Sequence, residues 1–312
     1  MLEIKLFGPG ELRYCGQQVT GFPNQAPYLL LCYLLLNRGH PHNRERLAAV
    51  FWSDSTIANS RKMLRNTLWR LRHGLSAVGV PVEFYFHLEE DSICFLQPQP
   101  YWLDVETFEK AAIPLQDIPS QPLTLTQVID LESAAALYVG DLLEGIYDDW
   151  CLYDRERLRL MHQSLLSKLM VYYGIRGSYE QGITYGLRLL AMDNTWEKIH
   201  RQLMWLYCLS GDRSTALAQY KLCQQILSEE LGVSPMPETR LLYEQMLHNQ
   251  FDPHGWLDIG EPLPRANKTP SDHSTQAASR LQAELHKLQE MIEATRAESN
   301  LIEKLIDDAL NS

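Results

Sequence analysis

The spacing of apolar and polar residues divides this 312-residue chain into a mixed first part and a helical second part. In the first part, short stretches alternate as strands do, and longer apolar runs are typical of helices. The expected elements are two strands over 2–8 and 11–19, three helices over 26–37, 44–52 and 57–76, and a hairpin over 82–88 and 92–96. This order predicts an α+β winged helix-turn-helix domain over residues 1–100.

The apolar period is helical from about residue 104 onward. Gly177 and Gly211 lie at turns between expected helices and are 34 residues apart. Gly182 and Ala216 occupy equivalent positions in the two units. A period of about 34 residues is typical of tetratricopeptide repeats, in which small residues let paired helices approach closely. The sequence therefore predicts an all-α tetratricopeptide-like helical repeat domain over residues 104–250.

The end of the chain changes character twice. Residues 251–279 are rich in proline and polar residues, which predicts a linker. Over residues 280–311, apolar positions such as Leu281, Leu285 and Leu288 follow the spacing of a coiled-coil seam. This pattern predicts a C-terminal amphipathic helix that pairs two copies into a homodimer. The alternative is a lone amphipathic helix that docks on its own protein.

Composition restricts the class of protein. The formal net charge is −11, and no stretch approaches the roughly 20 apolar residues of a membrane span. The start of the chain lacks the charged flank and long apolar core of a signal peptide. The six cysteines are scattered without a CxxC pair. We therefore expect a cytoplasmic protein with no membrane segment, no metal site, no cofactor and no catalytic centre.

Positive charge is concentrated in one segment of this acidic chain. Residues 38–73 contain eight Lys or Arg residues and only two carboxylates. The helix expected over 57–76 has leucines on one side and cations, an amide and an aromatic ring on the other. Such a local excess of positive charge suits a polyanion such as DNA, and a solvated basic face is the alternative interpretation.

Side-chain chemistry divides this basic segment into two expected sets. Arg pairs with guanine edges and Asn with adenine, while Lys and Arg contact phosphates. The residues expected to approach bases are Arg65, Asn66, Trp69, Arg70 and His73. The residues expected to approach phosphates are Arg44, Arg46, Arg61, Lys62 and Arg72.

Two separate motifs resemble one family of bacterial regulators. RERLAAVFW and LRNTLWRLR, over 44–52 and 64–72, resemble the DNA-binding domain of the Streptomyces antibiotic regulatory protein (SARP) family. The stretches over 138–159 and 211–246 are similar to the bacterial transcriptional activator domain of that family, and ELGVSPMPETRLLY is the most distinctive part. The resemblance covers residues 1–250.

This resemblance implies a sequence-specific transcription activator that binds double-stranded DNA at direct repeats near promoters and contacts RNA polymerase. It implies that the helical domain supports dimerisation or contacts partners. We also expect a small-molecule or protein effector to act at the helical domain. The wing tip over 89–91 is Glu-Glu-Asp where a basic residue is common, so DNA binding depends more on the helix and on Arg38, Arg44 and Arg46. The acidic wing and net charge favour an alternative, a protein-interaction adaptor with little DNA specificity of its own.

Overall fold

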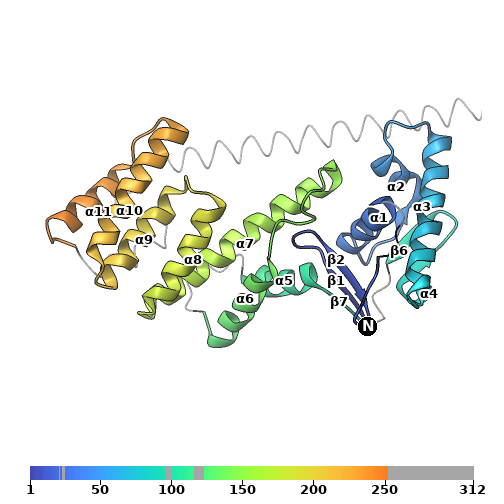
Figure 1. Ribbon diagram of the computed structural model, residues 1–312, viewed down its shortest axis with the longest axis horizontal. Coiled ribbons are helices and arrows are strands. Elements are labelled where there is room, and N and C mark those ends of the chain that lie inside the picture. Colours follow the sequence, from blue (N-terminus) through green and yellow to red (C-terminus); the bar gives the residue numbers. More distant parts are fainter. Residues whose placement is uncertain (21, 23–24, 96–99, 116–122, 252–312) are drawn as a thin grey trace, which may run out of the picture. The chain divides into compact units, whose positions relative to one another are not determined.

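The computed structural model describes residues 1–20, 22, 25–95, 100–115 and 123–251 (Figure 1). Except for residue 251, the expected linker and C-terminal helix lie outside these ranges, as does the seam that predicts a homodimer. The described chain begins with strands and short helices and continues as helices alone, which confirms the predicted fold class. None of the helices in these ranges is long and apolar enough to cross a membrane.

A four-stranded sheet begins the fold, and one of its strands was not predicted. The strands, in spatial order, are β3 (Gln17–Gln18), β2 (Glu11–Tyr14), β1 (Leu2–Lys5) and β7 (Tyr101–Leu103). β1 is antiparallel to β2 and parallel to β7, with Ile4 opposite Leu103. Parallel strands need a long crossover, and the chain between β3 and β7 supplies it.

Three helices follow β3, as the sequence predicts. They are α1 (Gln25–Leu36), α2 (Arg44–Phe51) and α3 (Ile57–Ala77). The side-chain oxygen of Asn43 caps α2 by accepting hydrogen bonds from the backbone N–H groups of Glu45 and Arg46, at 2.9 and 3.2 Å. The hydroxyl of Thr56 caps α3 by accepting from the N–H of Asn59 at 3.4 Å. These caps explain why α2 and α3 begin where they do.

The hairpin that follows α3 is shorter than predicted. Its elements are α4 (Val82–Tyr85), β5 (Phe86–Leu88) and β6 (Ser92–Phe95), and β6 also pairs with β4 (His42–Asn43). The first half of the expected strand over 82–88 is a helical turn. Pro81 precedes this turn with φ of −77°, which is close to the helical value. Val82 and Tyr85 are both buried, which suits a helical spacing of three residues and not strand alternation.

The second part of the chain consists of helices. They are α5 (Asp104–Ala112), the 3₁₀ turn η1 (Ile113–Leu115), α6 (Leu125–Leu137), α7 (Asp149–Ile175), α8 (Tyr179–Met192), α9 (Glu197–Leu209), α10 (Arg213–Ile226), the π turn η2 (Leu227–Leu231) and α11 (Pro237–Leu247). Gly177 and Gly211 have φ of +76° and +90° at the turns before α8 and α10, a conformation that favours glycine. A Cβ on Gly182 would lie 3.1 Å from Leu206 Cδ1, which confirms close packing at this small-residue position.

A buried carboxylate joins the first sheet to the helical part. Asp104, the first residue of α5, accepts hydrogen bonds from the backbone N–H groups of Leu6 at 2.8 Å and Phe7 at 3.0 Å. Burial raises the pKa of this carboxyl, while the same hydrogen bonds act in the opposite direction. The Phe7 ring packs against Phe108 and Tyr138, with ring centroids 5.3 and 4.8 Å apart. The end of β1 is therefore held by α5 and by the residue that follows α6.

Candidate nucleic-acid interface

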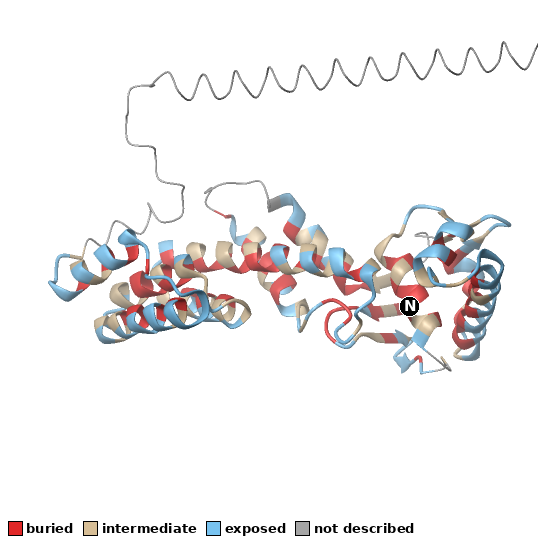
Figure 2. Ribbon diagram, turned by 90° about the horizontal axis from the view of Figure 1, so that it is seen from above, coloured by how far each residue is buried: buried red, intermediate tan, exposed pale blue. Residues whose placement is uncertain are grey.

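The helix α3 is fixed in the fold by one buried side. Leu64, Leu68, Leu71 and Leu75 are all buried, as their spacing predicts. Figure 2 shows this as a buried stripe along α3, with an exposed stripe on the opposite side. The outward side chains are therefore presented on a helix that cannot rotate without losing its packing.

The outward face of α3 carries exposed cations and no carboxylate. Each of the five residues expected to approach bases is exposed, as are Arg61, Lys62 and Arg72. The sequence of α3 contains neither Asp nor Glu. Among the described residues, no ion pair or hydrogen bond involves the side chains of Lys62, Arg65, Arg70 or Arg72. Their charges are thus free to meet phosphate groups.

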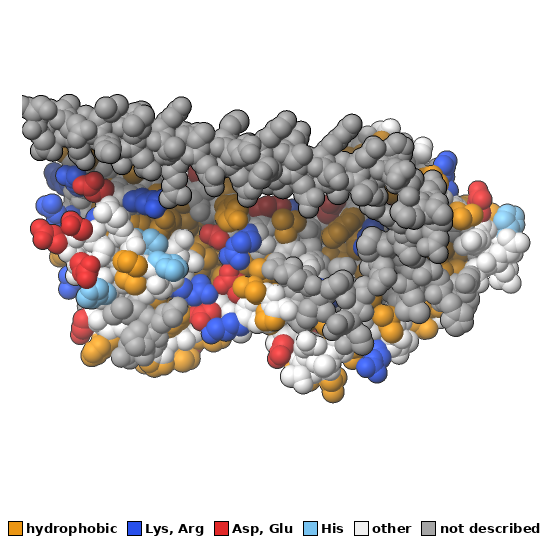
Figure 3. All heavy atoms as spheres, turned by 180° about the vertical axis from the view of Figure 1, so that it is seen from behind, with side chains coloured by type: hydrophobic (Ala, Val, Ile, Leu, Met, Phe, Trp, Pro, Cys, Tyr) orange, Lys and Arg blue, Asp and Glu red, His pale blue; other side chains and the backbone are white. Residues whose placement is uncertain are grey.

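This excess of cations is local to α3. On the face drawn in Figure 3, Lys and Arg side chains are interspersed with Asp and Glu side chains. The chain as a whole has 28 Lys and Arg against 39 Asp and Glu. The overall charge therefore does not favour indiscriminate binding to nucleic acid. Contact with nucleic acid would require the outward face of α3 to be turned toward it.

Two aromatic side chains lie at the centre of the outward face. Trp69 is 65% exposed, and its ring stacks on that of His73 with centroids 5.2 Å apart and an interplanar angle of 5°. The residues are four positions apart, so they are neighbours on the helix surface. The stack leaves a flat ring surface in solvent beside the cations.

The two cations of α2 that are expected to contact phosphates, Arg44 and Arg46, differ in exposure. Arg46 is exposed, whereas Arg44 is half-buried and its Nε has no hydrogen-bond partner among the described residues. The backbone N–H of Arg44 donates to the Asp91 carbonyl at 2.9 Å, which joins α2 to the wing. Arg61 of α3 forms an ion pair with Glu45 of α2. Part of the Arg61 charge is therefore balanced inside the protein.

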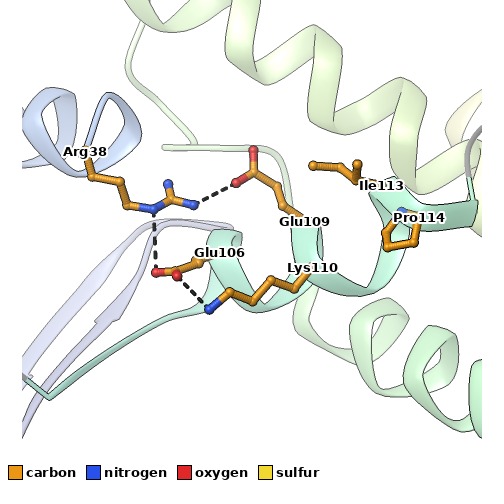
Figure 4. Close-up of a pocket in the computed structure, with 6 residues that line it drawn as sticks. All are labelled: Arg38, Glu106, Glu109, Lys110, Ile113 and Pro114. Carbon is orange, nitrogen blue, oxygen red and sulfur yellow. Dashed lines mark hydrogen bonds and ion pairs between the residues drawn. The ribbon is translucent and has the colours of Figure 1, made fainter. Parts of the chain in front are cut away.

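Arg38 differs from the sequence expectation. Its guanidinium contacts Glu109 at 3.0 Å and Glu106 at 3.5 Å, and only 15% of its side chain is exposed (Figure 4). Lys110 also contacts Glu106, at 2.7 Å, so the charges around this pocket balance one another. Arg157 of α7 approaches Glu109 from another side, at 2.7 Å. Arg38 therefore joins α1 to the helical part and is not available to DNA.

The wing tip keeps its negative charge. Glu89 accepts a hydrogen bond from the Ser92 hydroxyl at 2.8 Å and lies 3.0 Å from His87 Nε2. These contacts, that of Ser92 first, lower the pKa of the Glu89 carboxyl. Glu90 and Asp91 are exposed beside it. The described wing tip therefore contains no Lys or Arg that could contact a phosphate.

Comparison with known proteins identifies the second part of the chain. Residues 103–247 match the family model of the bacterial transcriptional activator domain. The regulatory protein MoaR1 of Mycobacterium tuberculosis is 25% identical over 248 residues, which are 79% of each chain. AfsR of Streptomyces coelicolor is 25% identical over 257 residues, or 81% of this chain and 24% of AfsR. This chain resembles the SARP-type transcription regulators.

The fold of this chain also matches a solved structure. EmbR of Mycobacterium tuberculosis, in complex with a low affinity phosphopeptide, superimposes with a TM-score of 0.66 at 19% sequence identity. The match covers 82% of this chain and 68% of EmbR. The likeness supports the arrangement of a winged-helix part followed by a helical activator domain. The matched family model and the relatives are described as transcriptional activators or regulators, and none of these descriptions names an enzyme.

Proposed function

We propose that this regulator is a sequence-specific DNA-binding activator that inserts α3 into the major groove. The observation that carries the proposal is the outward face of α3, which combines unpaired cations, an amide and two rings without a single carboxylate. A major groove is wide enough to admit one α-helix, and its floor presents the donors and acceptors that Arg and Asn recognise.

The proposed contacts follow from position and chemistry. Bases are read by Arg65, Asn66, Trp69, Arg70 and His73, and phosphates are contacted by Arg44, Arg46, Arg61, Lys62 and Arg72. Lys62 precedes Trp69 by two turns on the same side of α3, so its ammonium group lies toward the N-terminal part of the helix, where we expect it to meet a phosphate. Arg44 and Arg46 flank Glu45 in the sequence of α2, and Glu45 forms an ion pair with Arg61 of α3.

We further propose that the protein acts in the cytoplasm as a homodimer on direct repeats near promoters and contacts RNA polymerase. The order of the elements supports this proposal, because α3 lies outside residues 103–247, which match the activator domain and would provide the contacts with partners. A small-molecule or protein effector would act through that helical domain.

The test is selection of the full-length protein on a random-duplex library at moderate salt, followed by sequencing of the bound DNA. We expect an enriched motif that occurs twice in the same orientation, with a spacing near one helical turn. Polymerase recruitment is then tested by transcription in vitro from a promoter that carries this motif. If no motif is enriched and binding is weak and lost with salt, the proposal fails and the adaptor alternative gains support.

A further inference from the structure

We propose that the Trp69–His73 stack is a contact for the 5-methyl group of thymine, so that the preferred DNA site contains a thymine opposite the middle of α3. This inference rests on the proposed insertion of α3 into the major groove. The proposed function names the residues that approach bases. This inference adds the one chemical group of one base that the stack contacts.

The stack is placed and shaped for a flat apolar contact. Trp69 lies one turn after Arg65 and one turn before His73, at the centre of the face opposite the buried leucines. The two rings are nearly parallel, with an interplanar angle of 5°. His73 is the only ring that contacts the Trp69 ring in the described part of the chain. Trp69 as a whole is 65% exposed, so ring surface that His73 does not cover faces solvent in the free protein.

The charges around the stack favour DNA over a protein as its occupant. Arg65 and Arg72 lie one turn on either side of Trp69, and Lys62 lies two turns before it. None of these cations has an ion-pair partner among the described residues. An aromatic surface enclosed by unpaired cations is complementary to an apolar group that lies between rows of phosphates. The major groove provides this combination.

Within the major groove, thymine carries the only methyl group among the four bases. The other base edges present donors and acceptors, which an indole ring face cannot satisfy. Covering those polar edges with a ring would remove water without replacing its hydrogen bonds. The thymine methyl group, in contrast, loses only apolar contact with water when a ring covers it. Of the groups on the groove floor, it is therefore the one that the stack fits best.

The test uses the DNA motif enriched by the full-length protein. Each thymine in turn is replaced by deoxyuridine, which removes the methyl group and leaves base pairing intact. We expect one position per half-site at which this change weakens binding about fourfold, the effect of burying one methyl group. Trp69→Ala should weaken binding to the thymine site and abolish the difference between thymine and deoxyuridine at that position.

Two further variants separate a methyl contact from other roles. Trp69→Phe should keep part of the discrimination, because the smaller ring still covers the methyl group. Lys62→Ala should weaken binding to the thymine and deoxyuridine sites by the same factor, because a phosphate contact is insensitive to the base. Circular dichroism of Trp69→Ala should match the parent protein, since the side chain is mostly exposed.

Three results would overturn the inference. In the first, deoxyuridine has no effect at any position while the motif is still bound, which leaves the proposed function intact. In the second, Trp69→Ala weakens both sites equally and keeps the discrimination. In the third, Trp69→Ala binds DNA normally but no longer activates transcription in vitro, which assigns the stack to a protein partner. Failure of the proposed function itself is distinct, since no motif would then be enriched.

Discussion

Arg38 and Arg70 belong to the same basic segment of sequence, yet the folded protein places them in opposite surroundings. Arg38, just after α1, is 15% exposed and contacts two carboxylates of α5. Arg70 is exposed on α3, and no ion pair involves it in the described part of the chain. Arg38 is thus a structural cation, whereas Arg70 keeps its charge for an external partner.

The difference comes from residues that are distant in sequence. Glu109 is 71 residues from Arg38, and it also receives Arg157 from α7. A count of charges along the chain includes Arg38 among the cations that suit a polyanion. The fold removes it from that set, because a paired and half-buried guanidinium contributes little to the potential outside the protein.

We expect the largest effect on DNA affinity from variants of the exposed face of α3. Arg70→Ala or Asn66→Ala should weaken binding to the selected site by about 1–3 kcal/mol and relax base preference at one position. Fluorescence anisotropy on the selected site and on scrambled DNA measures both effects. Arg13→Ala, which removes an exposed arginine paired with Glu11 on β2, is the matched control and should bind normally. Equal losses on both DNAs would refute the base-reading role of Asn66 and Arg70.

Variants of the ion-pair cluster around Arg38 should change the stability of the protein and not its DNA binding. Glu109→Gln leaves the guanidinium groups of Arg38 and Arg157 without the carboxylate that lies between them. We expect this change to destabilise the full-length protein by about 1–2 kcal/mol in urea unfolding, which is below the cost for a fully buried pair because other carboxylates remain nearby. Glu83→Gln, at an exposed glutamate of α4, controls for the loss of one charge.

The DNA affinity of the Glu109→Gln variant shows whether the cluster around Arg38 acts only in folding or also in DNA binding. If the variant binds the selected site as the parent protein does, Arg38 and its partners act only in folding. A loss of affinity comparable to that of Arg70→Ala would show that the cluster also orients the DNA-binding surface, and the division between the two regions would no longer apply.

Local sequence patterns predicted the elements that depend on near neighbours. The leucine spacing of α3 and the small residues Gly182 and Ala216 correspond to packed positions in the structure. These features depend on contacts within a helix or between adjacent helices, so periodicity is sufficient to find them.

Features that depend on distant pairing were missed. β7 consists of three residues that pair with β1, nearly 100 residues earlier, and no local pattern marks so short a strand. The partners of Arg38 lie in another part of the chain. Glu106 and Glu109 are three residues apart in α5, a spacing that places two carboxylates on one side of a helix. The helical turn after Pro81 was mistaken for a strand, because a short apolar run fits both periods.

A smaller effect should separate cations that contact phosphate from cations that do not. Lys62→Ala should reduce the slope of log affinity against log salt concentration by about one, since one released counterion is lost. Arg38→Ala should leave the slope unchanged, because Arg38 is already paired inside the protein. Titrations on random DNA between low and moderate salt provide the measurement. A reduced slope for Arg38→Ala would place its charge on the DNA-binding surface after all.

The smallest expected effect concerns Arg61, which combines features of both regions. Arg61 lies on the exposed α3 but forms an ion pair with Glu45 of α2, and exposed pairs of this kind contribute only about 0–1 kcal/mol to stability. Glu45→Gln should free the guanidinium and remove a negative charge beside the phosphates, so DNA affinity should rise about twofold at low salt and less at high salt. Loss of a carboxylate from the first turn of α2 should cost a few tenths of a kcal/mol in folding, about the value of such a charge at a helix start.

Glu83→Gln again serves as control and should not raise DNA affinity. An unchanged affinity for Glu45→Gln would show that Arg61 stays directed toward α2 when DNA binds, and it would move Arg61 from the phosphate set to the group of structural cations that contains Arg38.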